Sequence, residues 1–230
     1  MSKIKLFVII KEDSERVPKK NFKVLGDMPL WKHLLYELYP YDVYVDTDSM
    51  EVLEQCSVDI NLSHIVAYPR KQKFIDVEKL DKENLSPVLG LINNFLDAHV
   101  SNDDDIIITT HVTSPFLTTR TIMDAVKKLD EGYDSIVSVT KYSDHSWMRE
   151  GEQYVPINFN PVVVQKTQDL NPIFMMNGAF FIFKKSTFKN QGMSRIGKNP
   201  YYYELTSPEH IEIDTYDDFN LANLVYKGLK

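Results

Sequence analysis

A group of cationic side chains near the start of the chain is the feature best suited to chemistry. They follow an apolar run, Ile4–Ile10, on a chain of 230 residues whose formal net charge is −7. Ammonium and guanidinium groups in a loop after a buried strand are typical of a site for an anionic ligand, such as a nucleoside triphosphate. A solvated surface loop is the alternative. The cationic residues are Lys11, Arg16, Lys19, Lys20 and Lys23.

Two pairs of carboxylates have the spacing of a divalent-cation site. Glu212 and Asp214 flank the end of a predicted last strand, Ile211–Ile213, and alternate residues of a strand project to the same face. Their side chains could therefore hold Mg²⁺ bound to a triphosphate. Asp46 and Asp48 form a second pair, which suits either a metal-dependent glycosyltransferase or the cap of a following helix.

Polar residues also lie beside two other predicted strands. Thr113-Ser114 and His111 follow the run Ile106–Thr110, where hydroxyl groups suit contacts to a sugar or a phosphate. A plain strand-to-helix turn has the same composition. Asn177-Gly178 precedes a further strand, and glycine there permits a close approach or an unusual backbone angle.

The elements that must position these residues alternate between strand and helix. This alternation predicts an α/β protein with a mostly parallel sheet covered on both faces. Strands are predicted at Ile4–Ile10, Val43–Val45, His64–Ala67, Ile106–Thr110, Ser135–Thr140, Ala179–Phe183, Tyr201–Tyr203 and Ile211–Ile213. Helices are predicted at Pro29–Leu38, Met50–Cys56 after Ser49, Pro87–His99 after Ser86, Thr118–Leu129 and Thr215–Tyr226, with a turn or short helix at Ser186–Lys189.

The loops that follow the predicted strands should meet in one cleft, because ligands of such sheets bind outside the carboxyl ends of the strands. These loops are 11–21, 46–49, 111–117 and 214–215. The segment Lys141–Met176 has no sustained hydrophobic period, and we interpret it as an arm of a single domain spanning residues 1–230.

Composition excludes several classes of protein. A hydrophobic content of 43% predicts a sizeable core and argues against disorder. The acidic balance argues against a general binder of nucleic acid or anionic membranes. The only cysteine, Cys56, cannot form an internal disulfide, and neither a secretory leader nor a membrane span is recognisable. We therefore expect a cytoplasmic protein.

Taken in order, these segments resemble the motifs of the acylneuraminate cytidylyltransferase (CMP-sialic acid synthetase) family over nearly the whole chain. The basic stretch Arg16-Val-Pro-Lys-Lys-Asn21 is similar to the family's nucleotide-binding loop, which ends in Pro-Gly-Lys-Asn. The other matching segments are Gly26-Asp-Met-Pro29-Leu30, Val45-Asp-Thr-Asp48, Thr113-Ser-Pro115, Gln168-Asp169-Leu170, Asn177-Gly-Ala179 and Glu212-Ile-Asp214-Thr215 with Asp217-Asp218.

The resemblance implies a Rossmann-like three-layer α/β/α nucleotidyltransferase domain and a homodimer whose subunits pair through the arm, residues 141–176. It implies a transferase that joins a 2-keto-3-deoxy sugar acid to CMP from CTP, with Mg²⁺, in the synthesis of surface polysaccharide. The nucleotide would contact Lys11, Ser14, Arg16, Lys20, Asn21, Asp48 and Arg70. The acid would contact His111, Thr113, Ser114, Lys166, Gln168 and Asn177; Asp214 and Glu212 would hold the metal; and catalysis would depend on Lys11, Arg16, Lys20 and Asp214.

The start of the loop departs from the family pattern. The family reads Ala-Arg-Gly-Gly-Ser-Lys where this chain has Ile10-Lys11-Glu12-Asp13-Ser14-Glu15. Two acidic residues thus stand where glycines let backbone amides approach phosphates. Two alternatives therefore remain open: a non-catalytic nucleotide-binding relative, and a glycosyltransferase that uses Asp46 and Asp48.

Overall fold

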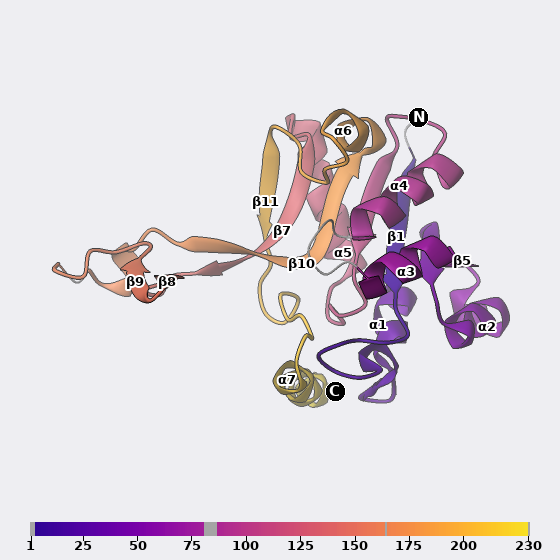
Figure 1. Cartoon of the computed structure of the whole chain (residues 1–230), viewed down its shortest axis with the longest axis horizontal. Helices are drawn as coiled ribbons and strands as arrows, with labels where there is room; N and C mark the ends of the chain where they lie inside the picture. The colour runs from indigo at the N-terminus through magenta and orange to yellow at the C-terminus, as the bar shows by residue number, and fades with distance from the viewer. Residues whose placement is uncertain (1–2, 81–86, 164, 230) are drawn as a thin grey trace.

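A seven-stranded sheet forms the centre of the molecule (Figure 1). The computed structural model describes residues 3–80, 87–163 and 165–229. The strand order is β11-β7-β10-β6-β1-β4-β5, and only β10 runs antiparallel to its neighbours among these strands. The mostly parallel sheet is thus confirmed. Its strands are β1 (Ile4–Ile10), β4 (Val43–Thr47), β5 (Ile65–Pro69), β6 (Ile106–Thr110), β7 (Ser135–Tyr142), β10 (Ile173–Lys184) and β11 (Pro200–Glu204).

Helices cover both faces of the sheet because successive residues of the buried strands point to opposite sides. Leu6 and Val8 of β1 pack against one helical layer, and Phe7 packs against the other. The first layer contains α1 (Leu30–Glu37), α2 (Met50–Val58) and α5 (Thr119–Val126). The second contains α4 (Pro87–His99) and α6 (Lys185–Asn190), beside α3 (Gln72–Leu80).

A third, smaller apolar cluster joins the C-terminal helix α7 (Tyr216–Gly228) to the segment before it. Ile211 and Ile213 are buried there together with Ala222 of α7. Thr215 caps the helix, since its side chain accepts from the backbone of Asp218 while the Asp218 carboxylate accepts from the backbone of Thr215. The short elements β2 (Val24–Leu25) and β3 (Met28–Pro29) complete this region, and the 3₁₀ helices are η1 (Lys20–Phe22), η2 (Ile60–Leu62), η3 (Lys127–Glu131) and η4 (Thr167–Asp169).

An arm extends from the sheet beyond β7 and β10 (Figure 1). At its end lies a hairpin of β8 (Trp147–Glu150) and β9 (Gln153–Pro156). β7 and β10 remain paired as they leave the domain, with Ile173 opposite Tyr142. The prediction that this region forms an excursion, with no second core of its own, is consistent with this shape.

One prediction of secondary structure was wrong, and one helix was not predicted. Residues 211–213 are not a strand: the segment is anchored by one backbone bond, from Ile213 N to Thr113 O at 2.8 Å, and by packing against α7. Alternating burial arises here from one-sided packing of a loop. Helix α3 was not predicted, and the predicted cap Ser86 lies outside the described residues. Within the described ranges, no helix is long and apolar enough to cross a membrane.

Candidate functional site

Two adjoining hollows lie at the carboxyl ends of β1 and β6. The first has a volume of about 340 Å³ and the second about 280 Å³, and both are lined by Lys11, Ser14 and Lys20. Because β1 and β6 are parallel, their following loops meet at this edge, as the sequence predicted. The first hollow is also lined by Ile9, Asn21, Pro87, Val88, His111, Val112 and Thr113, and the second by Asp13, Glu15 and Arg16.

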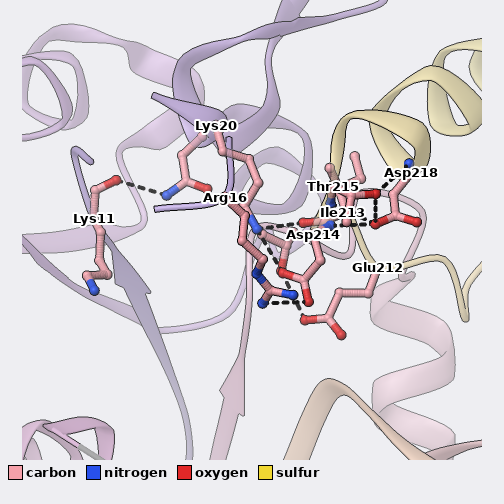
Figure 2. A network of polar contacts seen from close by, with 10 residues as sticks. Lys11, Arg16, Lys20, Glu212, Ile213, Asp214, Thr215 and Asp218 are labelled. Atoms are coloured by element: carbon pink, nitrogen blue, oxygen red, sulfur yellow. Dashed lines mark hydrogen bonds and ion pairs between the residues drawn. The ribbon is translucent and has the colours of Figure 1, made fainter. Parts of the chain in front are cut away.

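The basic loop and the acidic segment before α7 are joined by a network of ion pairs (Figure 2). Lys20 is buried, and its Nζ donates to Asp214 Oδ1 at 2.9 Å and to Ile213 O at 2.7 Å. Arg16, whose side chain is mostly exposed, lies 3.0 Å from Asp214 Oδ2. The Asp214 carboxylate thus binds two cations that come from a distant part of the chain. Because one negative charge offsets only one of the two positive charges, a net positive charge remains beside the hollows.

The cap of α7 fixes the position of Asp214. The backbone N–H of Asp214 donates to Asp218 Oδ2 at 3.0 Å, and Ile213 is tied to Thr113 on the adjacent loop. The acidic pair therefore acquires its geometry from a helix cap and a loop contact. The predicted strand geometry, in which both side chains share a strand face, is not how the structure arranges them.

Glu212 lies beside this network and is half-buried. Burial raises the pKa of its carboxyl to about 7, and the negative charge of Asp214 acts in the same direction. Thr113 Oγ1 donates to Glu212 Oε1 at 3.5 Å. Gly178 approaches from β10 with φ +71°, and a Cβ at that position would stand 3.3 Å from Glu212 Oε1. The close approach predicted for this glycine is thus to a site carboxylate.

A third hollow, of about 310 Å³, lies on the other side of Glu212, toward the arm. Asn177 lines it, and the Asn177 amide donates to Thr140 Oγ1 at 3.0 Å. Its other walls combine apolar and polar side chains: Tyr142, Met175, Met176, His210, Ile211, Asp218 and Leu221. This hollow offers space for a second ligand beside Glu212.

The Asn21 amide and the His111 imidazole, which both line the first hollow, have unusual surroundings. Asn21 is buried and donates to Lys11 O at 2.9 Å, while its Oδ1 has no hydrogen-bond partner among the described residues. Burial lowers the pKa of His111 to about 4; the charges of Arg195 and Lys20 act with it and that of Asp214 against it. The imidazole is therefore neutral at neutral pH.

The start of the basic loop is supported by Asp48 and by the buried ion pair of Arg70 with Asp46. Arg70 is buried and its Nε donates to Asp46 Oδ1 at 2.7 Å, while Asp48 Oδ1 accepts from the backbone of Glu12 at 2.8 Å. Asp46 is only 1% exposed, so this carboxylate cannot also serve the metal pair of a glycosyltransferase. Neither Asp48 nor Arg70 lines the hollows described above, and their contacts to a nucleotide remain predictions.

Three of the predicted acid-binding residues lie apart from the hollows. Ser114 is buried in the turn after β6, and Lys166 and Gln168 are exposed on the arm. A further cation near His111, Arg195, was not predicted as a site residue. Its guanidinium stacks over the ring of Phe181 at 3.7 Å from the ring centroid. No local motif marks this arginine, because its position depends on the packing of the loop after α6.

Several curated proteins are similar in sequence to this chain. No protein-family model matches the chain. N-acylneuraminate cytidylyltransferase A of Danio rerio is 27% identical over 229 residues, which cover 95% of this chain and 50% of that protein. The CMP-N,N'-diacetyllegionaminic acid synthase of Legionella pneumophila is 26% identical over 226 residues, or 91% of this chain and 90% of that protein. The resemblance to the acylneuraminate cytidylyltransferases is confirmed.

The chain spans about half the length of several acylneuraminate cytidylyltransferases that it matches. The enzyme of Streptococcus agalactiae serotype V, for example, is 23% identical over 216 residues, which are 90% of this chain and 49% of that protein. The similarity therefore covers nearly all of this chain but only one part of those longer relatives.

Solved structures show the same fold at low sequence identity. CMP:2-keto-3-deoxy-manno-octonic acid synthetase, solved in complex with CTP, matches with a TM-score of 0.62 at 12% identity, covering all of both chains. A 4-diphosphocytidyl-2C-methyl-D-erythritol synthase matches with a TM-score of 0.67 at 9% identity, covering 98% of this chain and 99% of the other. The predicted Rossmann-like α/β fold is confirmed.

Proposed function

We propose that this protein transfers CMP from CTP to a 2-keto-3-deoxy sugar acid and releases pyrophosphate. The observation that carries the proposal is the ion pair that joins Lys20 of the basic loop to Asp214 of the acidic segment, beside the first hollow. These are the two segments on which the resemblance to the acylneuraminate cytidylyltransferases most depends. Sequence similarity over more than 90% of the chain to a CMP-sugar-acid synthase supports the same reaction class.

The first two hollows are the proposed nucleotide site. Lys11, Arg16 and Lys20 would neutralise the triphosphate, and Ser14 would donate a hydroxyl to it. Asn21 Oδ1, the buried acceptor without a partner among described residues, would accept from the amino group of the base or a ribose hydroxyl. Cations held in place before the reaction favour the charge that grows on the departing pyrophosphate.

The proposed site of the sugar acid extends from the third hollow to the end of the first hollow that His111 and Thr113 line. Asn177, His111 and Thr113 would contact the acid and orient its anomeric hydroxyl toward the α-phosphate. The O–P bond to the sugar forms as the bond to pyrophosphate breaks, and the hydroxyl proton passes to solvent water. Lys166 and Gln168 would contribute from the arm, where they are exposed. Ser114 would act only through the turn that presents His111, because it is buried.

Glu212 and Asp214 fit the predicted Mg²⁺ in donor chemistry. Described residues include no group of three or more histidine, cysteine, aspartate or glutamate side chains that could hold a metal ion. Mg²⁺ at nucleotide sites commonly takes one or two carboxylates and completes its shell with phosphates and water. Burial raises the pKa of Glu212 most, and the charge of Asp214 raises it further, a repulsion that a divalent cation would relieve. When bound, the ion would supply further neutralisation of phosphate charge.

We also propose that the arm pairs with a second copy of the chain and that the protein works in the cytoplasm. Large apolar side chains are exposed along the arm, including Trp147, Tyr154 and Phe174. Such a patch on a thin extension is typical of a contact between subunits. Sedimentation of the wild type and of a Trp147→Ser, Tyr154→Ser double variant would test it, with loss of a dimer as the expected result.

The reaction is tested by incubating the purified protein with CTP, Mg²⁺ and a panel of nonulosonic and octulosonic acids. We expect pyrophosphate release with at least one acid and a CMP-sugar of matching mass. Nucleotide binding without release, for any acid and any nucleoside triphosphate, would instead support the non-catalytic alternative that Glu12 and Asp13 suggest.

A further inference from the structure

Arg195 is a partly buried cation without a carboxylate partner. Its guanidinium stacks on Phe181, and no described carboxylate lies within ion-pair distance of it. Burial lowers the pKa of Arg195 to about 10, with no acidic group acting in the other direction. Buried cations usually have an ion pair or a ligand, because desolvation otherwise costs free energy.

The loop that carries Arg195 is held firmly against the start of β7. Asp134 Oδ2 accepts from the backbone of Lys198 at 2.7 Å and of Asn199 at 3.0 Å. Gly197 donates to Ser135 Oγ at 2.8 Å, and a Cβ at Gly197 would collide with the Asp134 carboxylate. The position of Arg195 is therefore fixed by a specific loop conformation and does not depend on a partner for the guanidinium.

The strand register places Arg195 on the same face of the sheet as the first hollow. Ile107 belongs to the apolar cluster on that face, so Thr109 and then His111 follow it at two-residue spacing. Phe181 of β10 lies in the same cluster and directly opposite Thr109. The guanidinium on the Phe181 ring is therefore a neighbour of His111, and their charge interaction agrees with this placement.

Across this face, the order is the basic loop after β1, then His111 after β6, then Arg195 against β10. Two strand spacings, or about 10 Å, separate β1 from β10. The triphosphate is assigned to the Lys11 side. The other anion in the proposed reaction is the carboxylate of the sugar acid, which is attached to the anomeric carbon.

We infer that Arg195 binds the carboxylate of the sugar acid and thereby selects acids over neutral sugars at this site. This inference rests on the proposed function and adds a substrate contact to it. The planar guanidinium, held flat by Phe181 and the loop, can give a carboxylate two parallel hydrogen bonds, which an ammonium cannot.

The test compares pyrophosphate release by the wild type, Arg195→Gln and Arg195→Lys, with the acid from the panel that the wild type uses best. Arg195→Gln should raise KM for the acid about 10- to 100-fold, as expected for a lost charge-assisted contact, and leave KM for CTP within about twofold. For Arg195→Lys, KM for the acid should lie between the values of the wild type and Arg195→Gln. The carboxamide analogue of the acid should be a poor substrate for the wild type and no poorer for Arg195→Gln.

Arg120→Gln is the matched control, because Arg120 is an exposed arginine of α5 on the opposite face of the sheet. Unchanged KM for the acid in Arg195→Gln, or a rise for CTP alone, would overturn the inference while the proposed function stands. If the wild type releases no pyrophosphate, the proposed function fails by itself. Calorimetric binding of N-acetylneuraminate to wild type and Arg195→Gln then decides the inference, and equal affinity would overturn it.

Discussion

The buried ammonium of Lys20 lies 2.9 Å from Asp214 Oδ1, across 194 residues of sequence, and Arg16 holds the other oxygen of the same carboxylate. This contact joins the loop after β1 to the cap of α7 and closes the cleft between them. The Asp214 carboxylate and the Ile213 carbonyl replace the water that burial removes from the Lys20 side chain.

We expect Asp214→Asn to reduce pyrophosphate release by at least about 100-fold, because the variant loses the charge that orders Lys20 and Arg16 and the proposed metal ligand. The amide oxygen still accepts from Lys20, but the buried ammonium loses its ion pair, so the thermal midpoint should also fall and turnover is compared at a temperature where both proteins are folded. Asp217→Asn, at an exposed position of the first turn of α7, is the control and should keep wild-type turnover. Near-normal turnover by Asp214→Asn would remove this residue from the catalytic group.

Gly178 and Gly192 offer a matched pair for testing the approach to Glu212. Both have positive φ, +71° and +67°, but only Gly178 has a neighbour within 4 Å of an added Cβ. Alanine at either position should lower the free energy of unfolding by about 1 kcal/mol through backbone strain. Only Gly178→Ala should also lower kcat, because it displaces the Glu212 carboxylate. Equal kcat values for the two variants would contradict a working role for Glu212.

The sequence predicted the parts of this site that depend on local pattern. The run Ile4–Ile10 predicted the first strand with a cationic loop at its end, and the Thr215 and Asp218 spacing predicted the cap of α7. Parallel alternation of strands and helices then placed Lys11 and His111 at one edge.

Contacts made by tertiary packing were not predictable from local pattern. Ile211 and Ile213 alternate like a strand, yet they pack against α7 as a loop, because a hydrophobic alternation records only which side is buried. The sequence spacing of Asp46 and Asp48 suits a metal site, but in the structure Arg70, 24 residues away, binds the Asp46 carboxylate. The sequence around Arg195 does not indicate a binding residue, because the Phe181 ring on which it stacks lies on another element.

The stability of the protein should fall between pH 6.5 and pH 4 partly through His111. The folded protein holds this imidazole neutral, with a pKa of about 4, while the unfolded chain protonates it near its ordinary value of about 6.5. In that window the unfolded state binds more protons, so the free energy of unfolding decreases as the pH falls. The charges that face His111 are those of Arg195, Lys20 and Asp214.

Urea denaturation at pH 7 and pH 5 would measure this effect. His111→Gln should shrink the loss of unfolding free energy between the two pH values by on the order of 1 kcal/mol. His145→Gln on the arm keeps His111 and should retain the wild-type loss. A pH dependence that is the same in His111→Gln and wild type would show that another group is responsible.

Asp13 tests whether the departure of the basic loop from its family weakens nucleotide binding. Its carboxylate lines the second hollow beside Lys11, Arg16 and Lys20, where the triphosphate is proposed to lie. Asp13→Gly should therefore tighten CTP binding by roughly 3- to 10-fold, because a like charge is removed and a flexible backbone amide is added. Cytidine carries no phosphate, so its affinity should not change. Calorimetric titration of both ligands at low and high salt checks this, since a gain from removed repulsion must shrink as salt rises. A gain of equal size for cytidine, or none for CTP, would place the triphosphate away from Asp13.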